Sequence, residues 1–415
     1  MQDKDTAKST FMQLFSPVFS DSIRNLLIHL GVDRYAKKLA TLQLIQLVVF
    51  AHLGQLRGLR AISGSLKDDR LSRMVQLESI SPAQLSRRLR SLPPEIVEDV
   101  FRNTIREYIK QYGVHNVNNA LGRLYLIDST TVGLCFSRYP WAVFTKARGG
   151  VKLHLRLAFH NGRALPDQAT VTAAKQSDKT KMEELVVEEA GALNVFDRAY
   201  LDYKLFDRYC DRGVLFVTRL KSNAVTEVIA ERPVAPNGKV QKDQHVILGI
   251  NSISRMKNPL RLIETEDTDG NPIIILTNDF ERSAAEISDI YRYRWQIEVF
   301  FKWIKQHLRV KHFYGLSQRA VENQLIIALI TYCLVLLVQI KTGFQGTLLT
   351  VVQQLRTCLY DSFASFVRKL YERHGPSSKG RRRMNHEAIF QETLRQVTAR
   401  EADHLDDLTY DPVIL

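Results

Sequence analysis

The chain has 415 residues, of which 45% are hydrophobic, and it carries a net charge of +14 at neutral pH. This length and composition are those of a folded protein with two or three domains, and the positive excess favours nucleic acid as a partner, with an anionic membrane surface as the alternative. Four scattered cysteines have neither metal-binding spacing nor the density of a disulfide framework, which argues against a structural zinc site and fits a reducing cytosol.

Residues 1–118 are predicted to be helical. Apolar residues recur at helical spacing in Ile23–Leu30 and Ala40–Leu53, and Pro93-Pro94 begins a helix that runs through Tyr108. Arginines are interleaved with leucines, as in Gln84–Arg90. This pattern fits a helical DNA-binding module, and the solvated faces of a helical bundle remain the alternative.

Residues 119–220 are predicted to form the first part of an α/β core. A short buried strand comes first, followed by a strand that alternates between apolar and polar residues and by a tight turn at Asn161-Gly162. Strands and helices then succeed one another in the order β-β-β-α-β-α-β, which is that of an RNase H-like sheet. The predicted elements are strands Leu124–Thr130, Val151–Phe159, Pro166–Ala174, Leu193–Asp197 and Val214–Arg219, and helices Lys181–Glu189 and Tyr203–Cys210.

Residues 221–283 are predicted to be a β-rich insertion, with strands at His245–Ile250 and Pro272–Thr277. The core then ends within 284–345, starting with a long helix over Ala284–Leu308, and 346–415 form a helical C-terminal region with a basic loop at His374–Arg383. The apolar run Leu325–Ile340 is shorter than the ~20 residues of a membrane span. We therefore predict a buried core helix there, and an α/β, RNase H-like catalytic core flanked by α-helical N- and C-terminal regions.

The segment Tyr291–Lys305 has an unusual helical wheel. At about 100° per residue, Tyr291, Arg294, Glu298 and Lys305 fall within an arc of roughly 60°, while most of the remaining circumference is apolar. Charge on a largely buried helix is costly unless it is paired, bound to metal or used in function. A structural strip of ion pairs, including an i,i+4 pair between Arg294 and Glu298, is the alternative.

Three carboxylates can converge at one edge of this core. Asp128 and Asp197 end two strands that are neighbours in an RNase H-like order, and Glu298 lies on the helix that follows. Such oxygen ligands suit two Mg²⁺ or Mn²⁺ ions, which can activate a water or a 3′-hydroxyl for in-line displacement. Taken singly, each aspartate could instead be a turn or cap residue. The sequence contains no phosphate-binding loop, nucleophile elbow or zinc-protease motif.

These residues resemble the IS4-type DDE transposases of bacterial insertion sequences. The family signature Y-x2-R-x3-E-x6-K is complete as Tyr291, Arg294, Glu298 and Lys305. The first family aspartate matches Asp128 in Leu-Ile-Asp-Ser-Thr. The second matches Asp197 in Phe-Asp-Arg-Ala-Tyr, where an alanine replaces the usual glycine. A β-rich insertion before the glutamate is also a family trait.

The resemblance implies cut-and-paste transposition. A homodimer would bind the terminal inverted repeats of double-stranded DNA, cleave the ends through a hairpin and join them to target DNA. Asp128, Asp197 and Glu298 would hold two Mg²⁺ or Mn²⁺ ions. DNA would be contacted by Tyr291, Arg294, Lys305, Arg198 and Lys302.

The resemblance does not fix the role of two tryptophans. Trp295 or Trp303 could stack on a displaced base, but both lie on the apolar side of the wheel, where core packing is favoured. The N-terminus has no apolar secretory signal, and the resemblance implies a bacterial protein, so we expect it in the cytoplasm, at the nucleoid when bound to DNA, and not at membranes.

Two other functions compete with this interpretation. A metal-dependent nuclease of the same fold would cut DNA without joining it, but it would not need the complete Tyr, Arg, Glu and Lys set. A DNA-binding protein descended from a transposase would be expected to have lost a carboxylate, and none is missing.

Overall fold

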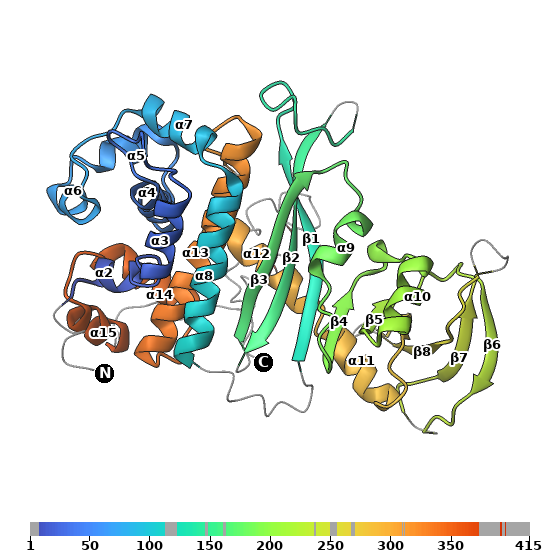
Figure 1. Ribbon diagram of the computed structural model, residues 1–415. Helices are drawn as coiled ribbons and strands as arrows, with labels where there is room; N and C mark the ends of the chain where they lie inside the picture. Colours follow the sequence, from blue (N-terminus) through green and yellow to red (C-terminus); the bar gives the residue numbers. More distant parts are fainter. Residues whose placement is uncertain are drawn as a thin grey trace.

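The computed structural model places a group of helices beside one large mixed sheet (Figure 1). It describes residues 8–112, 123–145, 148–160, 163–235, 238–249, 255–266, 270–308, 310, 312–372, 391 and 395. The predicted turn at Asn161-Gly162 and the predicted basic loop His374–Arg383 lie outside these residues.

Five strands build the RNase H-like part of the sheet. β1 (Arg123–Leu134), β2 (Gly149–His160) and β3 (Arg163–Ala173) form an antiparallel meander. β4 (Ala192–Phe196) pairs parallel with β1, and β5 (Leu215–Arg219) pairs parallel with β4. The order β3-β2-β1-β4-β5 confirms the predicted fold class.

Both faces of this sheet are buried. Within β4, Leu193 and Val195 pack toward the cluster that contains α12 (Trp295–His307), whereas Phe196 packs with Phe206 of α10 (Tyr203–Arg212) on the other face. Successive strand residues point to opposite faces, so a short, wholly apolar strand is what a covered sheet requires.

The helix predicted over Lys181–Glu189 is wrong in extent. The chain forms a short 3-10 helix, η1 (Asp178–Lys181), and a single turn, α9 (Met182–Leu185). The Asn194 side chain accepts from the Val187 backbone N–H at 2.9 Å and donates to the Val187 carbonyl at 3.0 Å. Because this buried amide takes both backbone groups of Val187, the helix cannot continue through it.

The insertion contributes four strands to the same sheet. β9 (Pro272–Thr277) pairs antiparallel with β5, and β8 (Leu260–Glu266), β7 (Lys242–Leu248) and β6 (Thr226–Glu231) follow outward. Only β7 and β9 correspond to the strands expected from sequence. The insertion therefore extends the core sheet instead of packing on it.

The N-terminal and C-terminal helices form one body, shown in blue and red in Figure 1. The backbone N–H of Thr10 donates to the Asp361 carbonyl at 2.8 Å, which joins the two ends of the described chain. Serines cap several helices; Ser81 and Gln84 form a capping box at α7. The helices are α2 (Thr10–Phe15), α3 (Asp21–His29), α4 (Thr41–Leu53), α5 (Leu59–Ser65), α6 (Asp69–Val75), α7 (Pro82–Ser91), α8 (Pro94–Tyr112), α14 (Leu348–Cys358) and α15 (Phe363–Tyr371).

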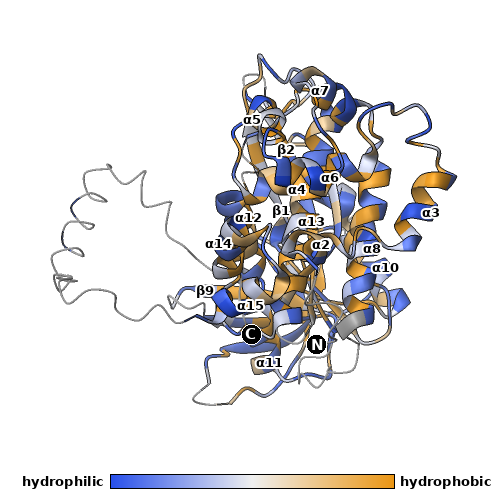
Figure 2. Ribbon diagram, turned by 90° about the vertical axis from the view of Figure 1, so that its left-hand side faces the viewer, coloured by the Kyte–Doolittle hydropathy of each residue, from blue (hydrophilic) through white to orange (hydrophobic). Residues whose placement is uncertain are grey.

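α13 (Gln318–Thr342) is the central helix between this body and the sheet. It is long and apolar enough to cross a membrane, so the length argument made from sequence does not hold, but 83% of its apolar window is buried in the protein. Most other helices carry both hydrophobic and hydrophilic stretches in Figure 2. Burial on all sides confirms the predicted core helix.

Candidate active site

Asp128 and Asp197 follow the last paired residues of two parallel strands. The pairing of β1 with β4 ends at Ile127 opposite Phe196. The next residues, Asp128 and Asp197, are therefore equivalent in register, and equivalent residues point to the same face. β1 does not end near Asp128 as predicted, since it continues along β2 to Leu134. Asp128 thus lies where β1 and β4 part.

The predicted single helix over Ala284–Leu308 is wrong, because it is broken before Glu298. α11 (Ala284–Arg292) and α12 are joined by Tyr293 and Arg294. Here the backbone bonds span three residues: Arg294 N–H donates to the Tyr291 carbonyl at 3.1 Å, and Ile297 N–H donates to the Arg294 carbonyl at 3.2 Å. Such a 3-10 turn has about 3.0 residues per turn, so the four signature residues do not share one continuous helix face.

Arg294 bridges two of the three carboxylates. Its guanidinium lies 2.7 Å from Glu298 Oε1 and 3.5 Å from Asp128 Oδ2. The i,i+4 pair that the sequence offered as an alternative is therefore present. The side chains of Arg294 and Asp128 are each 17% exposed and that of Glu298 is 37% exposed. In this partly buried setting the cation offsets the repulsion between the two carboxylates.

Burial raises the pKa of Asp128 to about 7. The negative charges of Asp197 and Glu298 contribute to this increase in pKa, and the Ser129 backbone N–H at 2.7 Å and Arg294 oppose it. A carboxyl group with a pKa near neutrality is a hallmark of a site built to bind a cation or to exchange a proton.

A cavity of about 470 Å³ opens between β1 and α12. Lys305 Nζ donates to Thr130 Oγ1 at 2.5 Å and to the Thr131 carbonyl at 3.3 Å, so this cation is held against β1. Lys302 and Arg198 are exposed. Asp197 does not line this cavity, whose walls are Asp128, Ser129, Thr130, Glu298, Phe301, Lys302, Lys305 and Gln306.

The aromatic residues of the signature segment have different environments. Tyr291 is 7% exposed, and the Arg294 guanidinium lies 5.8 Å from the centre of its ring. Trp303 is fully buried against Tyr332, which confirms core packing for that residue. Core packing is wrong for Trp295, which is 61% exposed, because the turn before α12 carries it away from the apolar side.

Sequence reasoning missed Asp178, a fourth carboxylate beside Asp128. It accepts from Ser129 Oγ at 2.6 Å, pairs with Lys152 at 3.2 Å and lies 3.5 Å from His154 Nδ1. These contacts tie η1 to β1 one residue after Asp128. The available signal was the polar face of β2, where Lys152, His154 and Arg156 alternate with leucines and require acidic neighbours.

The three carboxylates fit a hard divalent cation by their chemistry. The Asp197 carboxylate has no hydrogen-bond or ion-pair partner among the described residues, although its backbone carbonyl accepts from Tyr200 N–H at 3.1 Å, so its side-chain oxygens are available as ligands. In the described part of the chain, however, no three acidic, histidine or cysteine side chains are already gathered around one point. Arg294 instead occupies the position between Asp128 and Glu298.

The chain is similar to several transposases. One relative, named as a transposase for insertion sequence element IS5377 of Geobacillus stearothermophilus, is 34% identical over 60% of this chain and 62% of its own length. Another, named as transposase y4zB of Sinorhizobium fredii, is 31% identical over 57% of this chain and 67% of its own. The chain thus spans less than two thirds of the first relative.

A solved structure is also similar, at a low level. The piggyBac transposase, in a synaptic complex with hairpin DNA, aligns with 91% of this chain and 84% of its own at a TM-score of 0.44 and 13% identity. A likeness of this strength supports no functional argument. Residues 119–334, more than half of the chain, match the family described as transposase DDE domain. The chain therefore belongs to the DDE transposase family.

Proposed function

We propose that this protein is a cut-and-paste DNA transposase. The observation that carries the proposal is the adjacency of Asp128 and Asp197 in the β1–β4 register, with Glu298 joined to Asp128 through Arg294. Three carboxylates, two of which line an open cavity, suit phosphoryl transfer better than any other chemistry that the described residues could support.

Asp128, Asp197 and Glu298 would hold two Mg²⁺ or Mn²⁺ ions. The ions would supply activation of the attacking oxygen and charge stabilisation of the leaving oxygen. When the carboxylates bind metal, Arg294 would exchange Asp128 and Glu298 for a phosphate, to which a guanidinium binds in a bidentate manner. The ion pairs of Arg294 would thus keep the site charge-balanced before DNA arrives.

The remaining signature residues would bind the DNA at the transposon end. Lys305, held against β1 by Thr130, would present a fixed positive charge to a phosphate beside the cut. Tyr291 would orient Arg294, and Arg198 and Lys302 would add exposed cations. Trp295, exposed and adjacent to Arg294, would stack on a base displaced from the duplex.

The reaction would consist of four displacements at phosphorus. Water breaks the bond at the transposon end and frees a 3′-hydroxyl. That hydroxyl attacks the opposite strand, forming a hairpin and releasing the flanking DNA. A second water opens the hairpin, and the restored 3′-hydroxyl joins target DNA as a target 3′-oxygen leaves. The protein would act as a dimer on paired inverted repeats in the bacterial cytoplasm, at the nucleoid.

A cleavage assay tests the proposal. Full-length protein would be incubated with Mg²⁺ and a labelled duplex that carries the inverted repeats flanking its gene, beside Asp128→Ala and Glu298→Ala. We expect nicks and hairpins at the repeat boundary with the wild type and with neither variant. Circular dichroism would check that both variants fold.

Other outcomes would support the competing functions. Nicks without hairpins or joined products would indicate a nuclease. Binding without cleavage by the wild type would indicate a DNA-binding relative that has lost catalysis. Cleavage that survives in both variants would place the active site elsewhere.

A further inference from the structure

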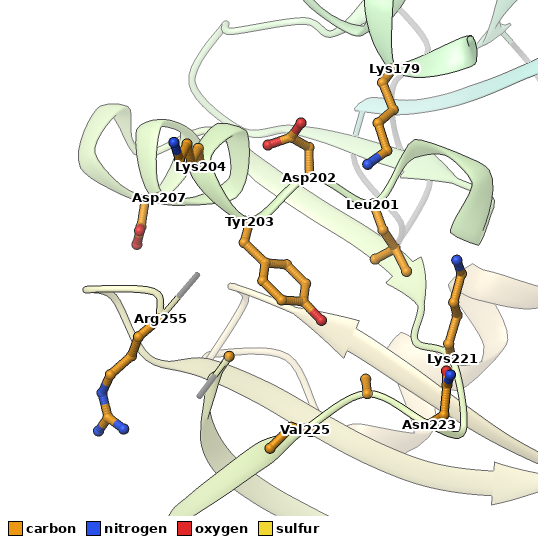
Figure 3. A pocket seen from close by; sticks show the side chains of 12 residues that line it. Lys179, Leu201, Asp202, Tyr203, Lys204, Asp207, Lys221, Asn223, Val225 and Arg255 are labelled. Atoms are coloured by element: carbon orange, nitrogen blue, oxygen red, sulfur yellow. The ribbon is translucent and has the colours of Figure 1, made fainter. Parts of the chain in front are cut away.

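A second cavity, of about 590 Å³, shares no lining residue with the β1–α12 cavity (Figure 3). Its walls come from η1, from the start of α10 and from the segment after β5. Tyr203 lies in its middle, with Lys179 and Lys221 on one side and Arg255 on the other (Figure 3).

The cavity walls carry a net positive charge: Lys179, Lys204, Lys221 and Arg255 face Asp202 and Asp207, and only Arg255 has an ion-pair partner, Glu227, among the described residues. Lys179, Lys204 and Lys221 are exposed and have no carboxylate within ion-pair distance among the described residues. The two acidic wall residues are held by backbone groups: Asp202 caps α10 by accepting from Leu205 N–H at 3.2 Å, and Asp207 accepts from Asn258 N–H at 2.9 Å, so their two charges offset only part of the positive charge. The site therefore favours an anionic ligand.

The cavity also offers an aromatic surface. Tyr203 is partly buried against the apolar cluster that contains Phe196 and Phe206, so its ring is held in place, and Leu201 and Val225 add apolar walls. Cations around a fixed aromatic ring are the features by which proteins bind single-stranded nucleic acid: lysines contact the phosphates and bases stack on the ring.

Several residues that line the cavity are close in sequence to the proposed metal ligands or to the strands that carry them. Leu201 comes four residues after Asp197, and Lys179 follows Asp178, which accepts a hydrogen bond from Ser129 beside Asp128. Lys221 comes two residues after the end of β5, the strand next to β4. The same segments therefore carry both the proposed metal ligands and the walls of the cavity.

We propose that this cavity binds single-stranded DNA, with a base stacked on Tyr203 and the flanking phosphates on Lys179 and Lys221. This inference rests on the proposed function, because the bound strand would be DNA that has been separated from its complement during cleavage at the active site. It adds a contact for unpaired DNA outside the signature segment.

Fluorescence anisotropy with a labelled single-stranded oligonucleotide tests this inference in EDTA, where cleavage cannot occur. We expect Tyr203→Ala to weaken binding about 5- to 150-fold, since stacking on one aromatic residue contributes about 1–3 kcal/mol. Tyr203→Phe keeps the ring and should bind as wild type. Thermal unfolding would show whether Tyr203→Ala retains its fold.

A variant with Lys179→Ala and Lys221→Ala avoids any effect on the core, because both side chains are exposed. It should reduce the slope of log affinity against log salt by about 1.4, at about 0.7 per lost contact with a single strand. Lys239→Ala with Lys242→Ala removes the same charge elsewhere and should change the slope less.

The outcomes separate this inference from the proposed function. Wild-type affinity for the single strand in both Tyr203→Ala and the lysine variant, or no single-strand binding by the wild type, would overturn the inference even if the protein nicks transposon ends in Mg²⁺. Absence of nicking by the wild type would instead count against the proposed function, whatever the anisotropy shows.

Discussion

Burial and two neighbouring carboxylates raise the pKa of Asp128 from 3.8 to about 7. A group whose pKa is higher in the folded state stabilises the fold below its unfolded pKa, and this contribution is lost as the pH rises through the folded pKa. At pH 8 the ionised Asp128 therefore costs stability. The site keeps a charge that the fold alone would not favour, as functional sites often do.

We expect Asp128→Asn to be more stable than the wild type at pH 8 by roughly 1–4 kcal/mol, since one pKa unit corresponds to about 1.4 kcal/mol. The difference should shrink as the pH falls from 8 to 5, because the wild-type carboxyl then takes up its proton. Urea unfolding at both pH values measures it. An equal or lower stability of Asp128→Asn at pH 8 would show that this carboxylate is well compensated by Arg294.

At the scale of elements, a buried ion pair joins two strands of the insertion, β7 and β8. Arg261 of β8 is 1% exposed; its guanidinium lies 2.7 Å from Asp243 of β7 and donates to the Asp279 carbonyl at 3.2 Å. Asp279 lies between β9 and α11, so one guanidinium links the inserted strands to the segment that leads into the signature residues.

Removal of one partner should leave the other charged and buried. Arg261→Met should cost about 3–5 kcal/mol, whereas Arg261→Met with Asp243→Leu should be markedly less destabilised. Chemical denaturation of the wild type, both single variants and the double variant gives the coupling energy. Additive effects of the two substitutions would mean that the pair does not act as a unit.

The elements also show the limits of sequence reasoning. The β-β-β-α-β-α-β order was predictable because short apolar runs and turn residues mark covered strands. The break between α11 and α12 was not, because Tyr293 and Arg294 keep helical dihedral angles and only their hydrogen bonds change. β8 was missed because Arg261, a buried charge, interrupts its apolar pattern.

The candidate site was only partly accessible from sequence. The spacing of Tyr291, Arg294, Glu298 and Lys305 was visible, but the direct contacts of Arg294 with Asp128 and Glu298 depend on packing between β1 and α12. Asp178 gave no signal of its own, since it lies in a turn-like segment and acquires partners only when η1 folds against β1 and β2.

For the molecule as a whole, the net charge of +14 should dominate duplex binding. If six or more phosphates are contacted, log affinity should fall with log salt at a slope of about −5 or steeper. Titrations of a labelled duplex in EDTA between 50 and 200 mM salt, approximately the range over which this effect is large, would measure the slope. A slope near zero would exclude the extended phosphate contacts that a transposase needs.

Asp197 provides the most direct test of the central claim, that three carboxylates serve as metal ligands for DNA cleavage. It adjoins Asp128 in register but lies outside the β1–α12 cavity. Nicking of the repeat-bearing duplex would be measured with Asp197→Cys and Asp197→Ala in Mg²⁺ and in Mn²⁺. A thiolate is a softer ligand that Mg²⁺ binds poorly. We predict that neither variant nicks in Mg²⁺ and that only Asp197→Cys regains nicking in Mn²⁺. Wild-type nicking by Asp197→Ala in Mg²⁺ would contradict the claim.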